Sequence, residues 1–125
     1  MNVIDSSGWL EYFAGGPNAA FFAPALADAK RIIVPSISIL EVFRRIRTQR
    51  DEQAALIAVA AMQQGRVIDL DVEVALLASR LGIELKLPLA DSVILATARI
   101  HGAILWTQDA DFEGLPDVRH VRRRS

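Results

Sequence analysis

Short apolar runs that alternate with segments of helical periodicity most limit how this chain can fold. The clearest run is Ile104-Leu105-Trp106, which shows no alternation of polar and apolar residues and so suits a parallel strand covered on both faces. Strands that alternate with helices favour a mostly parallel sheet, so we predict an α/β fold, a three-layer α/β/α sandwich. The predicted strands are residues 1–4, 31–34, 67–70, 104–106 and 117–121. The predicted helices are one through Trp9 and Phe13, then 18–29, one that Ser36 caps, 51–64, 72–81 and 88–101, which Pro88 opens.

The size and composition indicate one domain, residues 1–125, with 52% hydrophobic residues for its core. Fourteen basic residues nearly balance fifteen acidic ones, so the net charge favours no class of partner. Twelve of the basic residues are arginines, and seven of these are gathered within residues 44–50 and 122–124. Arginine suits bidentate phosphate contact, although either group also fits a solvated face. With no cysteine and no apolar run near the ~20 residues that span a bilayer, we expect a soluble, cytoplasmic protein with no membrane partner.

Three acidic residues follow predicted strands. Asp5 comes directly after the first strand, and Asp109 and Asp111 stand just beyond the run that ends at Thr107. In open α/β sheets, ligands bind beyond the carboxyl ends of the strands, so these acids are candidates for a site. Each also has a local structural explanation, because Asp5 suits a helix N-cap and Asp109 with Asp111 suits a polar turn. Local evidence leaves both explanations open.

Two further acids lie on predicted helices. Glu41 falls opposite the apolar stripe of its helix, and an ion pair with Arg45 is the alternative to a role in a site. Asp91 instead shares the packing face of its helix with Ile94 and Leu95. Burial of an unpaired carboxylate costs several kcal/mol. Local structure therefore explains Asp91 least, and we favour a functional role for it.

A parallel sheet can bring these five acids to one edge. Carboxylates in a small volume repel one another unless a cation neutralises them. The donors are all oxygen, with neither cysteine nor a histidine pair at helical spacing, which points to a hard ion, Mg2+ or Mn2+. Because Mg2+ retains waters and binds phosphate oxygens, the matching chemistry is metal-assisted hydrolysis of a phosphodiester bond.

Four motifs, taken in order, carry a resemblance to a known family. The motifs are Val-Ile-Asp5-Ser-Ser, Ser-Ile-Leu-Glu41, Leu-Pro-Leu-Ala-Asp91-Ser-Val-Ile-Leu-Ala-Thr-Ala and Leu-Trp-Thr-Gln-Asp109-Ala-Asp111-Phe. Together they resemble the PIN-domain ribonucleases, and the chain is most similar to the VapC toxins of bacterial and archaeal VapBC toxin–antitoxin pairs. The resemblance covers essentially the whole chain, with one departure at Ser92, where an apolar residue or threonine is more usual.

The resemblance implies an activity, partners and site residues. The activity is a divalent-metal-dependent endoribonuclease that cuts single-stranded or loop RNA. The partners are a second copy of the chain, in a homodimer, and a co-expressed VapB-like antitoxin that neutralises the toxin. The matching residues are an acidic quartet, a frequent fifth acid and two supporting hydroxyls, which are respectively Asp5, Glu41, Asp91 and Asp109, then Asp111, then Ser6 and Thr107.

Each site residue has an expected role. We expect Asp5, Asp91 and Asp109 to bind the metal directly or through water, with Asp111 as a further member of the metal set. Glu41 completes that set and is expected to orient or deprotonate the attacking water. For the antitoxin, the aromatic side chains near the N-terminus are possible contacts, although a place in the core is the favoured explanation and they are not assigned to the site. They are Trp9, Tyr12, Phe13, Phe21 and Phe22.

Two other classes of protein fit parts of the sequence. A phospho-accepting receiver-like signalling domain has a similar length, and Asp69 is its candidate acceptor, but it needs a late lysine and none follows Lys86. A non-catalytic PIN-like binding module is the second alternative, which the complete quartet disfavours. Asp71 is expected only to cap the helix 72–81. His101 and His120 are expected in the core or on the surface.

Overall fold

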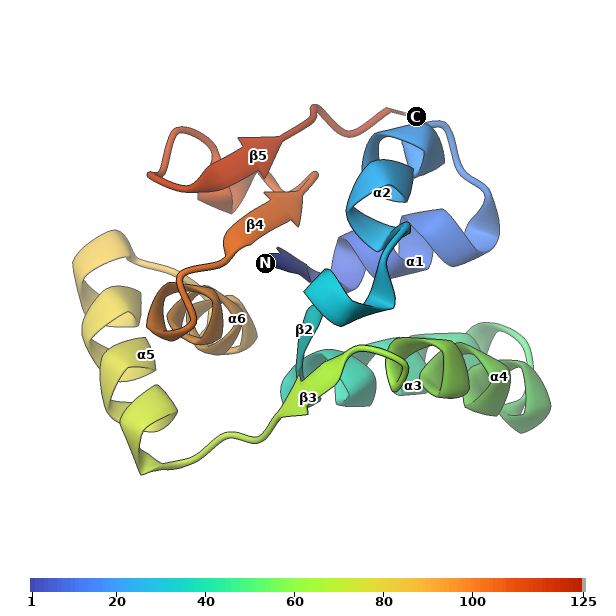
Figure 1. Cartoon of the computed structure of the whole chain (residues 1–125), viewed down its shortest axis with the longest axis horizontal. Helices are drawn as coiled ribbons and strands as arrows, with labels where there is room; N and C mark the ends of the chain where they lie inside the picture. The colour runs from blue at the N-terminus through green and yellow to red at the C-terminus, as the bar shows by residue number, and fades with distance from the viewer. Residues whose placement is uncertain (125) are drawn as a thin grey trace.

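Short strands alternate with helices along residues 1–124, which this computed structural model describes (Figure 1). The predicted α/β architecture is confirmed, with the ends of several elements shifted by a few residues. In chain order the elements are β1 (Asn2–Ile4), α1 (Ser6–Ala14), α2 (Ala19–Leu26), the 3-10 turn η1 (Ala29–Arg31), β2 (Ile33–Pro35), α3 (Ser36–Gln49), α4 (Glu52–Met62), β3 (Arg66–Ile68), α5 (Val72–Leu85), α6 (Leu89–Ile100), β4 (Ile104–Thr107), the 3-10 turn η2 (Ala110–Phe112) and β5 (Val118–His120).

All the paired strands are parallel. One sheet has the order β1-β4-β5, a second pairs β2 with β3, and an isolated parallel bridge between Asn2 and Ile32 links the two. The resulting order is 3-2-1-4-5, whereas receiver-type sheets have the order 2-1-3-4-5. Asp69 therefore follows an edge strand, where it is exposed to solvent. The receiver-like alternative is wrong in its topology.

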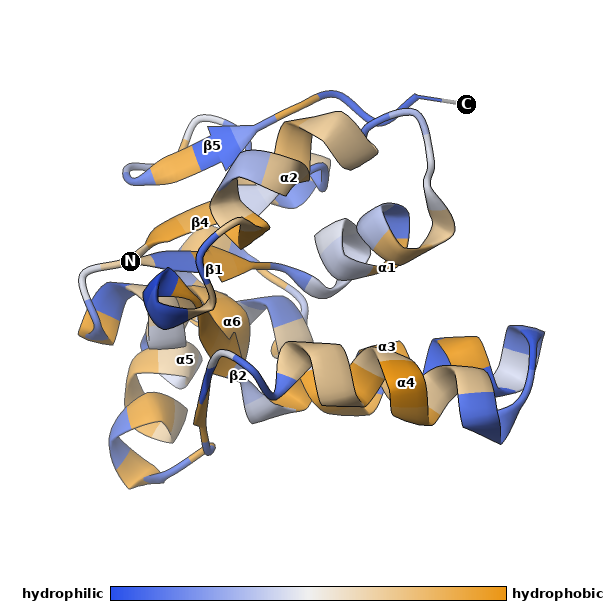
Figure 2. Ribbon diagram, turned by 45° about the vertical axis from the view of Figure 1, so that its right-hand side comes forward, coloured by the Kyte–Doolittle hydropathy of each residue, from blue (hydrophilic) through white to orange (hydrophobic). Residues whose placement is uncertain are grey.

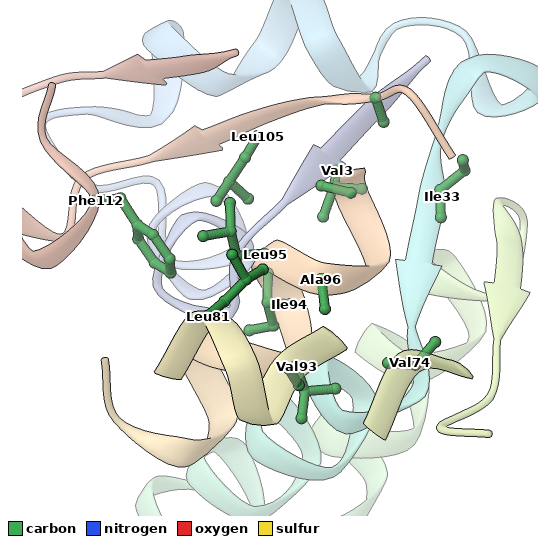
Figure 3. Close-up of a cluster of buried hydrophobic side chains, with 13 residues drawn as sticks. Val3, Ile33, Val74, Leu81, Val93, Ile94, Leu95, Ala96, Leu105 and Phe112 are labelled. Atoms are coloured by element: carbon green, nitrogen blue, oxygen red, sulfur yellow. The ribbon is translucent and has the colours of Figure 1, made fainter. Parts of the chain in front are cut away.

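Helical layers cover both faces of the strands. Val3 and Ile4 are neighbours on β1 and both fully buried, yet they belong to different hydrophobic clusters because successive side chains point to opposite faces. The cluster around Val3 packs against α5 and α6 (Figure 3). The cluster around Ile4 contains Trp9 and Phe22 and packs against helices α1 to α4. In Figure 2, α3 and α4 extend away from the strands as an antiparallel pair.

Several local predictions concern helix ends. Asp5 and Asp71 are N-caps as expected, and each side chain accepts a hydrogen bond from a backbone N–H three residues later. The prediction that Ser36 caps its helix was wrong, because Pro35 holds the N-cap position and Ser36 is the first residue of α3. Likewise Pro88 is the N-cap residue of α6 and not its first helical residue.

The helix predicted over residues 72–81 is longer than expected. It continues to Leu85, whose side chain packs against the buried cluster, and Lys86 then ends it in a left-handed conformation (φ 56°). The helix predicted over residues 18–29 is shorter than expected, because it ends at Leu26 and a 3-10 turn follows. No helix within residues 1–124 is both long and apolar enough to cross a membrane.

Candidate active site

A cleft of about 920 Å3 opens where β1 and β4 end. Four of the predicted acids line it, and each comes from a different place in the chain: the end of β1, the middle of α3, the first turn of α6 and the loop after β4. Arginines share its wall, chiefly on α3. The acids are Asp5, Glu41, Asp91 and Asp109, and the arginines are Arg44, Arg45, Arg50 and Arg123.

The tightest acidic group contains the fifth acid. Carboxylate oxygens of Asp91, Asp109 and Asp111 all lie within 4.8 Å of one another. The loop itself shapes this group, because the Asp111 N–H donates to Asp109 Oδ1 at 2.9 Å and turns the chain into η2. Three convergent carboxylates are a donor set that suits a hard divalent cation. Asp5 and Glu41 lie beside this group rather than within it.

Asp5 is held by hydrogen bonds from its own neighbourhood. Its side chain is 2% exposed, with Oδ1 accepting from Gly8 N at 2.8 Å and Oδ2 accepting from Thr107 Oγ1 at 2.8 Å. The Ser7 hydroxyl lies 3.0 Å from both oxygens. Capping and membership of the site were alternatives in the sequence, yet the structure combines them, because the cap bond uses only part of the carboxylate's accepting capacity.

The two most perturbed acids have raised pKa values. Burial raises the pKa of Asp91 to about 7, and the charges of Asp109, Asp5, Glu41 and Asp111 add to the effect. Burial also raises the pKa of Asp5 to about 6, against hydrogen bonds that lower it and with a smaller upward contribution from Asp109. Both shifts disfavour the ionised forms, and a bound cation would reverse that preference.

Glu41 contacts the first turn of α1 instead of its own helix. Ser6 Oγ donates to Glu41 Oε1 at 2.6 Å, across the cleft between α1 and α3. No ion pair within 4.0 Å joins Glu41 to Arg45 in residues 1–124. The proposed pairing along the helix is therefore wrong, because the tertiary contact with Ser6 takes its place.

Thr107 links two of the acids directly. Its hydroxyl donates to Asp5 Oδ2 and accepts from the Asp109 N–H at 2.9 Å. The side chain is fully buried, so both bonds are shielded from water. Ser6 and Thr107, the two supporting hydroxyls expected from the sequence, each hold a predicted acid.

Sequence reasoning missed a buried amide pair behind the acidic loop. Asn18 Nδ2 donates to Gln108 Oε1 at 2.9 Å, and Gln108 Nε2 donates to the carbonyl oxygen of Ser7 at 3.4 Å. Both amide side chains are at least 96% buried. Glu11 joins the network by accepting from Asn18 N at 2.8 Å. The only sequence signal for this pair was that Gln108 directly precedes Asp109. No local pattern pairs residues that lie ninety positions apart.

Neither histidine belongs to the acidic group. His101 is the C-cap residue of α6 and is partly buried. His120 lies on β5, and its Nε2 is buried without a hydrogen-bond partner among residues 1–124. Of the five N-terminal aromatics, Trp9 and Phe22 are core residues, Phe13 and Phe21 are partly buried, and Tyr12 is exposed.

Comparisons with known proteins agree with this arrangement. A toxin–antitoxin complex from Klebsiella pneumoniae contains a chain that is 27% identical, with a TM-score of 0.81 over 95% of this chain and 96% of that one. VapC20 of Mycobacterium tuberculosis, a sarcin–ricin loop cleaving toxin, is 19% identical with a TM-score of 0.77 over 95% and 99%. A chain of VapBC2 from Rickettsia felis, in a structure bound to a promoter DNA fragment, is 14% identical with a TM-score of 0.73 over 97% of both chains. The latter two show the fold alone.

A search among curated protein sequences found no match. A model of the PIN domain family, in contrast, matches residues 3–118, which include every acid of the cleft. The order of the strands and the three-layer packing agree with that match. The chain therefore belongs to the PIN domain family.

Proposed function

We propose that this chain is a divalent-metal-dependent endoribonuclease, formed by a single nuclease domain of residues 1–125, and the toxin of a type II toxin–antitoxin pair. The observation that carries the proposal is the convergence of Asp91, Asp109 and Asp111 within 4.8 Å, beside Asp5 and Glu41 in the same cleft. The similarity to toxin–antitoxin structures supports the biological role.

The donor set fits Mg2+ or Mn2+. Asp91, Asp109 and Asp111 would hold the ion, with Asp5 acting directly or through water. When bound, the ion supplies Lewis-acid activation of the phosphodiester and of a water molecule. The raised pKa values of Asp91 and Asp5 support this assignment, because neither carboxylate forms an ion pair with a basic side chain of residues 1–124.

The remaining groups orient the reactants. Ser6 occupies Oε1 of Glu41 and fixes the side chain, while Oε2 accepts no hydrogen bond from residues 1–124. Glu41 is thus able to accept a proton from, or orient, an attacking water at the cleft. Thr107 and Ser7 hold Asp5 in place, and Thr107 also fixes the backbone at Asp109.

Cleavage of RNA in the presence and absence of metal tests the proposal. We expect purified protein to cut RNA with Mg2+ or Mn2+, EDTA to abolish cutting, and Asp91→Asn to lose activity while keeping its circular dichroism spectrum. Asp69→Asn is the matched control, because Asp69 is exposed and lies outside the cleft. Undiminished cutting in EDTA would exclude the metal mechanism. A folded, metal-loaded protein that cuts no RNA would be a PIN-like binding module instead.

We propose three further features of the biological setting. The enzyme acts in the cytoplasm, where its RNA substrate is found. It forms a homodimer, for which exposed apolar side chains along one face of α5 provide a surface: Val72, Leu76 and Ile83. A VapB-like antitoxin binds and neutralises it, which co-purification with the product of a neighbouring gene would test.

A further inference from the structure

A second cleft adjoins the acidic one. It is lined by residues of the acidic loop, of the end of β5 and of the chain after β5, and it shares Gln108, Asp109 and Arg123 with the first cleft. The two hollows therefore meet at Asp109, so one extended ligand can occupy both. The other residues that line the second cleft are Ala110, Glu113, His120 and Arg122.

Hydrogen bonds hold the chain after β5 against this junction. Val121 N donates to the carbonyl oxygen of Thr107 at 3.0 Å, two residues before Asp109. Asn18 Nδ2, which also binds Gln108, donates to the carbonyl oxygen of Arg122 at 3.0 Å. The backbone of residues 121–122 is thereby attached to the same buried network that supports the acidic loop.

The arginines of this tail differ in what they contact. The Arg119 guanidinium lies 5.1 Å from the centre of the Trp106 ring and is engaged there. Arg122 and Arg123 are exposed, and neither has a carboxylate within 4.0 Å in residues 1–124. Arginine beside a cleft, with its side-chain donors uncommitted, suits a phosphate group, which it binds through two parallel hydrogen bonds.

We propose that Arg122 and Arg123 form a phosphate-binding subsite for the RNA strand that continues past the acidic cluster through the second cleft. The subsite rests on the proposed ribonuclease function. Arg44, Arg45 and Arg50 line the first cleft, so arginine side chains line both clefts. A polyanion that must approach five carboxylates gains from cationic contacts in both clefts, because these offset its repulsion from the acids.

Binding of RNA at several salt concentrations tests the subsite. The probe is a short fluorescein-labelled oligouridine, measured by anisotropy in an Asp91→Asn background so that it stays intact. The variant is Arg122→Gln with Arg123→Gln. The matched control is Lys30→Gln with Arg31→Gln, which removes the same charge from two exposed neighbours outside both clefts.

We expect the tail variant to weaken binding several-fold and to reduce the slope of log affinity against log salt by ~1.4, since each lost phosphate contact on a single strand removes ~0.7. The control should leave the slope unchanged, and Arg122→Lys with Arg123→Lys should restore most of it. An equal loss in the tail variant and the control would overturn the subsite, because only general charge would then matter. The subsite would also be overturned if the tail variant kept its RNA affinity but no longer co-purified with an acidic protein, because the two arginines would then bind that protein and not RNA.

The outcome is separable from that of the proposed function. If the parent cuts RNA and the tail variant binds oligouridine as the control does, the subsite is wrong and the nuclease stands. If the parent cuts no RNA but the tail variant alone loses affinity, the nuclease is wrong and the subsite stands. Melting curves of both double variants check that each is folded.

Discussion

Thr107 shows how a single buried hydroxyl organises charged neighbours. It sits at the end of β4, fully buried, and serves at once as donor to Asp5 and acceptor for the Asp109 N–H. Its bond to Asp5 lowers the pKa of that carboxyl against the larger upward effect of burial. One residue thereby holds Asp5 and the backbone at Asp109 in place and lowers the pKa of Asp5.

Thr107→Val should separate the hydroxyl from the packing that surrounds it. Valine keeps the shape but leaves Asp5 Oδ2 and the Asp109 N–H each short of a partner, at a cost of ~1–3 kcal/mol of unfolding free energy. We expect a lower melting temperature and weaker RNA cleavage. Thr107→Ser retains the hydroxyl and is the control, so equal losses in the valine and serine variants would contradict the assignment.

The raised pKa of Asp91 makes the stability of the metal-free protein depend on pH. The pKa is about 7 in the folded state, whereas an aspartate in the unfolded chain titrates near ~3.9. Between these values the folded state binds more protons than the unfolded state, so stability falls as the pH rises. Asp5, with a folded pKa of about 6, contributes with the same sign.

In chelator, the melting temperature of the parent should therefore fall from about pH 5 to about pH 8 by more than that of Asp91→Asn. Excess Mg2+ or Mn2+ should remove most of the difference, because the ion binds the ionised carboxylates. Thermal melting at several pH values, with and without metal, measures both effects. Parallel curves for the two proteins in chelator would show that Asp91 contributes nothing to the pH dependence.

At the scale of elements, the packing of α5 on α6 positions Asp91. Gly82 of α5 faces Ser92 of α6, and a Cβ added at residue 82 would lie only 2.6 Å from Ser92 Oγ. Ser92 is buried and donates to the carbonyl oxygen of Pro88 at 2.9 Å, which turns its hydroxyl back onto the start of its own helix. Ser92 follows Asp91 directly, so a shift of α6 away from α5 would also move the Asp91 carboxylate.

Gly82→Ala should destabilise the protein by ~1–3 kcal/mol through overpacking against Ser92. It should also weaken the response of the melting temperature to Mn2+, because α6 carries Asp91. On a Ser92→Ala background the same change should be neutral or stabilising, since the nearest remaining contact is Cβ to Cβ at 3.4 Å and alanine favours a helix by ~1 kcal/mol over glycine. Additive effects in this double-mutant cycle would refute the contact.

At the scale of the whole molecule, helix α5 exposes apolar side chains to solvent. Val72, Leu76 and Ile83 share one face of α5, and Ile83 is 81% exposed. Exposed apolar side chains that gather along one helix are typical of protein interfaces. The proposed homodimer would bury this face and leave the acidic cleft, which other elements form, open to RNA.

Ile83→Glu should convert the proposed dimer into a monomer, because an interface cannot readily bury an unpaired carboxylate. Light scattering after size-exclusion chromatography gives the mass. Gln64→Glu adds the same charge at an exposed position away from α5 and should leave the mass unchanged. A dimer that persists in Ile83→Glu, or a parent that is already monomeric, would exclude this face as the dimer surface.

The sequence by itself determined the class of fold and the candidate acids. Apolar runs without alternation predicted buried parallel strands, and helical spacing predicted the helices between them, because both signals depend only on neighbouring residues. The caps at Asp5 and Asp71 were predictable for the same reason. Asp91 was recognisable as unusual because a carboxylate on an apolar helix face has no local explanation.

Only the tertiary structure decided how those residues are used. It grouped Asp91 with Asp109 and Asp111, gave Glu41 to Ser6 instead of Arg45, and joined Asn18 to Gln108 and the tail at Arg122. Local rules cannot predict such contacts, because their partners lie tens of residues apart and meet only when the sheet and its two helical layers pack. Helix ends such as Leu85 depend on the same packing, since burial against the core extends a helix beyond its local signal.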